Sequence, residues 1–118
     1  MFTETLKALV DQTEGGVASL LMDSSGIALE TYVREGAELD ITTVGIEFSV
    51  VLGSIKRASE MLDAGTAREL SIGTEKLTTL IRCLGDSYFL AVALEPDGNH
   101  GKARYLMRTA APKLLADL

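Results

Sequence analysis

The chain has 118 residues, of which 47% are hydrophobic and 24% charged, and its formal net charge at pH 7 is −6. This length and composition are typical of one globular domain over residues 1–118 and exclude intrinsic disorder. A net acidic chain is poorly suited to contact the phosphate backbone of nucleic acids, so we expect no nucleic-acid partner.

Membrane insertion and secretion are also disfavoured. Uncharged runs such as residues 87–94 are far too short to span a bilayer. Glu4 and Lys7 stand where a signal peptide would need an apolar core. The single cysteine, Cys83, cannot form an internal disulfide, and we expect it to be a buried strand residue. These features predict a cytoplasmic protein.

The first part of the chain predicts a helix followed by a hairpin. Apolar residues in residues 2–13 recur at helical spacing, and the glycine pair after this segment is a suitable stop. Two apolar-rich runs follow at residues 17–23 and 27–33. The short connection at residues 24–26 ends in glycine, which predicts a tight turn between two antiparallel strands.

A long helix is predicted over residues 40–61, with Asp40 as its N-terminal cap and Gly65 beyond its end. It carries two apolar rows. The first, expected to cover the core, comprises Ile41, Val44, Phe48, Val51, Leu52, Ile55, Ala58 and Leu62. The second comprises Ile46, Val50, Gly53 and Met61, with Arg57 at the same helical phase. A helix on a small domain needs one apolar face, so the second row predicts contact with a second subunit or a protein partner.

Beyond the long helix the hydrophobic pattern alternates, which predicts three strands at residues 69–72, 77–84 and 87–94. The tight connections predict an antiparallel meander. The last strand is apolar on both faces and should be central, whereas the first is polar on one face and should lie at an edge. A final helix begins near Asn99, and Pro112 should kink it or start a separate last turn.

The element order is therefore α-β-β-α-β-β-β-α. It predicts an α/β sandwich with one five-stranded antiparallel sheet, the long helix on one face and the terminal helices on the other.

No pattern of catalytic residues is present. His100 is the only histidine and lies at the start of the last helix, where a cap or surface role is expected. Nucleophile and base pairs, zinc-binding patterns and a phosphate-binding glycine loop with lysine are all missing from the sequence. We expect no enzymatic activity, no catalytic residue, no cofactor and no metal ion.

The order of elements, together with two segments, resembles the Roadblock dynein-light-chain family. The segments are Asp-Ser-Ser-Gly-Ile-Ala-Leu at residues 23–29 and Gly-Asn-His-Gly-Lys-Ala-Arg-Tyr at residues 98–105. Residues 88–90 and 111–113 also fit the pattern. The resemblance covers the whole chain and is strongest to the bacterial Mgl-type regulators of a small Ras-like GTPase in cell polarity and gliding motility.

The resemblance implies a homodimer in which the long helices pair and the edge strand meets its symmetry mate. The residues implied at this dimer interface are Ile46, Val50, Gly53, Arg57, Met61, Leu70 and Ile72. A second patch, on the hairpin side, is expected to bind a partner through Met22, Asp23, Ser25 and Ile27.

Two functions follow from the resemblance. The first is a non-enzymatic adaptor that binds an MglB-like Roadblock protein, with a response-regulator-type polarity protein as a further candidate partner and recruitment to the cell poles. The second is activation or scaffolding of the Ras-like GTPase itself, with Arg57 as the candidate arginine finger. A small-molecule sensor is a weaker third interpretation, since the inward positions are ordinary aliphatic residues.

Overall fold

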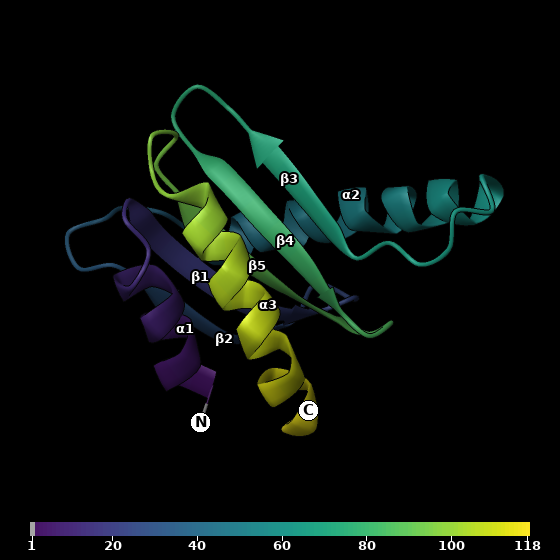
Figure 1. Cartoon of the computed structure of the whole chain (residues 1–118), viewed down its shortest axis with the longest axis horizontal. Helices are drawn as coiled ribbons and strands as arrows, with labels where there is room; N and C mark the ends of the chain where they lie inside the picture. Colours follow the sequence, from purple (N-terminus) through teal and green to yellow (C-terminus); the bar gives the residue numbers. More distant parts are fainter. Residues whose placement is uncertain (1) are drawn as a thin grey trace.

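A computed structural model describes residues 2–118 and contains the predicted order of elements (Figure 1). The elements are α1 (Phe2–Asp11), β1 (Gly16–Asp23), β2 (Ala28–Val33), α2 (Ile41–Met61), β3 (Glu69–Gly73), β4 (Thr78–Leu84), β5 (Tyr88–Leu94) and α3 (His100–Ala116). The five strands form one sheet in the order β2-β1-β5-β4-β3, and every neighbouring pair is antiparallel. The predicted fold class is therefore confirmed, with β5 central and β3 at an edge.

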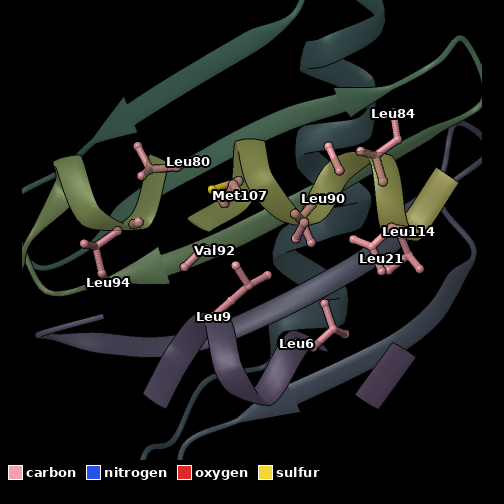
Figure 2. Close-up of a cluster of buried hydrophobic side chains, with 13 residues drawn as sticks. Leu6, Leu9, Leu21, Leu80, Leu84, Leu90, Val92, Leu94, Met107 and Leu114 are labelled. Carbon is pink, nitrogen blue, oxygen red and sulfur yellow. The ribbon is translucent and has the colours of Figure 1, made fainter. Parts of the chain in front are cut away.

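The two terminal helices cover one face of the sheet. Leu6 and Leu9 of α1 and Met107 and Leu114 of α3 pack around Leu90 of β5, as Figure 2 shows. A buried hydroxyl joins α1 to the sheet, because Ser19 Oγ donates a hydrogen bond of 2.8 Å to the Leu6 carbonyl. Burial of this apolar layer is the main source of stability on this side.

Two turns touch at one end of this layer and require glycine. Gly15, between α1 and β1, has a φ of +83°, and a Cβ there would lie 2.8 Å from the Gly98 Cα in the turn before α3. Positive φ and backbone contact both exclude larger residues. The contact fixes α1 and α3 at the same end of the sheet.

α2 covers the opposite face, and its first turn is capped as predicted. Asp40 Oδ2 accepts from the Thr43 hydroxyl at 2.7 Å, and Oδ1 accepts from the Thr43 N–H at 3.1 Å. These hydrogen bonds lower the pKa of the Asp40 carboxyl from its ordinary value, the hydroxyl bond being the larger cause. The charged Asp40 cap therefore stabilises the first turn of α2 fully at neutral pH, and this stabilisation is lost as the pH falls through the lowered pKa.

The expected inner row of α2 is wrong in its second half. Ile41 and Leu52 are buried, but Val51 and Ala58 are exposed and Leu62 is 78% exposed. The reason is the direction of the helix. Figure 1 shows the C-terminal half of α2 running past the β3 edge, where the sheet no longer lies beneath it.

α3 is continuous through Pro112, so the expected separate last turn does not form. Asn99 caps the helix, with its side chain accepting from the Lys102 N–H at 3.0 Å. Pro112 lies on the exposed side of the helix. Water can therefore reach the carbonyl of Arg108, which the proline leaves without a backbone donor.

Candidate protein interaction surfaces

The second apolar row of α2 lies on the molecular surface. We call Ile46, Val50, Gly53, Arg57 and Met61 the outer row. Val50 is 66% exposed and Met61 is 87% exposed. Arg57 is exposed too, and its Nη2 donates to Ser54 Oγ at 3.1 Å. The outer row therefore presents aliphatic side chains around a glycine and an arginine, a composition typical of protein interfaces.

The β3 edge lies on the same side of the molecule as the projecting half of α2 (Figure 1). Within residues 2–118, β3 pairs with β4 alone, which leaves its other edge without a strand partner. Leu70 and Ile72 are half-buried against the core beneath α2, and the alternate residues face solvent. Unpaired backbone groups along such an edge can receive a strand from another chain.

The tip of the β1–β2 hairpin is held by side-chain hydrogen bonds and carries an exposed aliphatic side chain. Asp23 Oδ1 accepts hydrogen bonds from the N–H of Ser25 at 2.9 Å and of Ile27 at 3.0 Å. Ile27 is 63% exposed and Ser25 is exposed. Asp23, Ser25 and Ile27 are the hairpin patch.

Met22 is not part of the accessible patch, although it was expected there. Its side chain is fully buried in the core beneath α2. The cause is the place of β1 inside the sheet, where strand neighbours and helices cover both faces. A partner at the hairpin can contact the side chains on either side of the turn but not this one.

The hairpin tip touches the beginning of the outer row. A Cβ at Gly26 would lie 3.8 Å from Ile46 Cγ1 and 3.5 Å from Ser49 Oγ. The two surfaces expected from the sequence are therefore continuous, although they are about twenty positions apart along the chain. Gly26 also has a φ of +86°, which favours glycine in this turn.

A small hollow lies between α2, the hairpin tip and the β4–β5 turn. Its volume is about 140 Å³, and it is lined by Ser24, Ser49, Leu52, Gly53, Lys56, Asp86, Tyr88 and Phe89. The two turns are held together because the Ser24 N–H donates to the Ser87 carbonyl at 2.8 Å. Lys56 Nζ reaches across the hollow to the Asp86 carbonyl at 3.4 Å.

A scan of known protein families found no match, and neither did a search of curated proteins. Among solved structures, MglC from Myxococcus xanthus is 40% identical, with 99% of this chain and 98% of that chain covered and a TM-score of 0.71.

The chain belongs to the Roadblock family.

Other solved Roadblock-like structures agree with this assignment in fold. The gliding protein mglB from Thermus thermophilus is 17% identical over 97% of this chain and 85% of that chain, with a TM-score of 0.86. A Roadblock/LC7 domain from Streptomyces avermitilis is 15% identical over 95% and 96% of the two chains, with a TM-score of 0.77. The Mgl-type resemblance expected from the sequence is confirmed by the identity to MglC.

Within residues 2–118 no group of three or more His, Cys, Asp and Glu residues could hold a metal ion. Cys83 is half-buried on β4, and burial raises the pKa of its thiol, which lowers the thiolate fraction at neutral pH. In the same part of the chain, no helix is long and apolar enough to cross a membrane.

Two features of this Roadblock chain were missed from the sequence. Gly45 is buried where α2 comes closest to β1, and a Cβ there would meet Leu20 Cδ2 and Met22 Cε. The hollow was missed as well. Its signal was the pair Ser49 and Lys56, which lie seven positions apart on the side of α2 next to Gly53 of the outer row.

Proposed function

We propose that this chain is a non-enzymatic homodimeric adaptor in the circuit of a small Ras-like GTPase that controls cell polarity or gliding motility. It binds an MglB-like Roadblock protein. The observation that carries the proposal is the exposed apolar outer row, continuous with the hairpin patch. The 40% identity to MglC over nearly the whole chain supports the Mgl-type circuit. A cytoplasmic location with recruitment to the cell poles remains a prediction of this proposal.

Self-association is assigned to the outer row and the β3 edge, including Leu70 and Ile72. Of the exposed large hydrophobic residues within residues 2–118, half belong to α2 or its C-terminal cap. They are Ile46, Val50, Val51, Met61 and Leu62. In a two-fold dimer the same surface is used by both copies. A stable dimer of this kind needs about 1,000 Å² of buried surface in total.

Partner binding is assigned to the hairpin patch, which leads to a first prediction. We expect Ile27→Asp to weaken binding of the MglB-like protein by a factor of about 30 or more, because a central aliphatic contact is replaced by a charge that must lose its water. Isothermal titration calorimetry with the MglB-like protein of the same genome measures this. Leu115→Asp on α3 is the control, since it makes a similar change on the opposite face of the sheet and should leave affinity unchanged. Equal affinity of the Ile27→Asp variant and the unaltered protein would contradict the assignment.

Direct activation or scaffolding of the GTPase is the second candidate, and the observation in its favour is the exposed guanidinium of Arg57. No carboxylate lies within 4.0 Å of this group in residues 2–118, so only its hydrogen bond to Ser54 Oγ would have to break, and no ion pair, for it to reach a bound nucleotide. The adaptor proposal predicts that phosphate release by the cognate GTPase stays at its basal rate when this protein is added. Acceleration that is lost in Arg57→Ala would favour the second candidate instead.

A further inference from the structure

The hollow beside α2 has the size of one side chain. Its volume of about 140 Å³ is well below the roughly 300–1,000 Å³ of pockets that hold small molecules. Leu52 and Phe89 supply apolar lining, whereas Ser24 and Lys56 supply polar groups. A hollow with this mixture suits a short side chain that has an apolar stem and a polar end.

The ammonium group of Lys56 favours a negatively charged group in the hollow. The Lys56 side chain is half-buried, and its only hydrogen bond within residues 2–118 is the 3.4 Å contact with the Asp86 carbonyl. No carboxylate of these residues lies within 4.0 Å of its ammonium group. An ammonium group has three donors, so at least two remain for water or a ligand.

The other polar groups around the hollow do not remove its preference for a negatively charged group. Ser49 Oγ already donates to the Ile46 carbonyl at 2.6 Å, whereas the Lys56 ammonium and the Ser24 hydroxyl are side-chain donors that can serve a ligand. Asp86 is exposed, and water can solvate its charge. Neither Lys56 nor Asp86 has an ion-pair partner within 4.0 Å in residues 2–118, and Lys56 is the half-buried one of the two.

The hollow adjoins both the hairpin patch and the outer row. Ser24 lies between two residues of the hairpin patch, and Gly53 belongs to the outer row. A protein that covers the hairpin patch also approaches the mouth of the hollow and excludes water from it. A lysine that loses its water without gaining an opposite charge is strongly destabilising.

We propose that the hollow receives an aspartate or glutamate side chain of the MglB-like partner, whose carboxylate pairs with Lys56 and accepts a hydrogen bond from the Ser24 hydroxyl. This inference rests on the proposed function, because it names a further contact of the same complex. The carboxylate neutralises Lys56 as water leaves, and the stem of the side chain packs on Leu52 and Phe89.

The test uses Lys56→Gln, with Lys76→Gln as the matched control. Both lysines are on the surface, but Lys76 lies in the β3–β4 turn at the opposite end of β4 from Asp86. Calorimetry with the MglB-like protein should show Lys56→Gln weakened by about tenfold or more, with a reduced dependence on salt. Lys76→Gln should match the unaltered protein, and Lys56→Arg should retain most of the affinity because the charge remains.

Three outcomes would overturn the inference, and they are distinguishable. If Ile27→Asp prevents binding while Lys56→Gln binds normally, the hollow is not part of the contact and the proposed function stands. If Lys56→Gln and Lys76→Gln weaken binding equally, the effect is general charge attraction. If the unaltered protein does not bind the MglB-like protein, the proposed function fails, and this inference fails with it.

Discussion

The Val50→Asp variant is expected to be a folded monomer, whereas the unaltered protein is expected to be a dimer. Val50 is 66% exposed, so its side chain contributes little to the core of one chain. In a two-fold interface each chain would bury one new carboxylate, which must lose its water, and this opposes association. Size-exclusion chromatography with light scattering should give the mass of one chain for the variant and of two chains for the unaltered protein.

The matched control for this experiment is Leu115→Asp. Leu115 is also an exposed aliphatic residue of a helix, but α3 lies on the other face of the sheet. This variant should remain dimeric. Circular dichroism checks that both variants are folded. A Val50→Asp protein with the mass of two chains at micromolar concentration would show that the outer row is not the self-association surface.

The second large effect is expected at Gly45. A Cβ at this position would overlap Leu20 Cδ2 and lie 3.0 Å from Met22 Cε, so Gly45→Ala forces these buried side chains or α2 itself to shift. Overpacking of this kind costs about 1–3 kcal/mol, which exceeds the gain of up to about 1 kcal/mol from the better helix propensity of alanine. Urea unfolding should therefore show a lower free energy of unfolding for Gly45→Ala.

Gly53 in the same helix provides the comparison. A Cβ there would meet only Arg57 Nη1, at 3.7 Å, so Gly53→Ala should stabilise the helix by up to about 1 kcal/mol. Both substitutions are best measured in the Val50→Asp background, where self-association does not contribute to stability. Equal effects of the two glycine substitutions would mean that the contact between α2 and β1 is loose.

The helices and strands could be predicted from the sequence because the local hydrophobic pattern of each segment agrees with its burial in the fold. The period changes from helical to alternating after Gly65, and the wholly apolar run of β5 indicates a strand covered on both faces. The edge position of β3 followed from its polar face. These predictions needed only the chemistry of neighbouring residues.

The sites were harder to predict because they depend on where elements end in space. Periodicity places Val51 and Leu62 in the inner row of α2, but it does not reveal that the sheet stops before the helix does. Periodicity also cannot show that Met22 lies under α2 or that Gly26 touches Ile46. The hollow with Lys56 needs two turns and a helix brought together from three parts of the chain.

The unsupported end of α2 has a consequence for the newly made protein. A helix end with little packing opens at a small cost in free energy, and the loop after Met61 is exposed as far as Thr66. We therefore expect a single chain to offer proteases a cleavage site at this end, and the proposed dimer to cover it. On that proposal the lifetime of the protein in the cell is linked to its assembly, and unassembled copies are expected to be removed first.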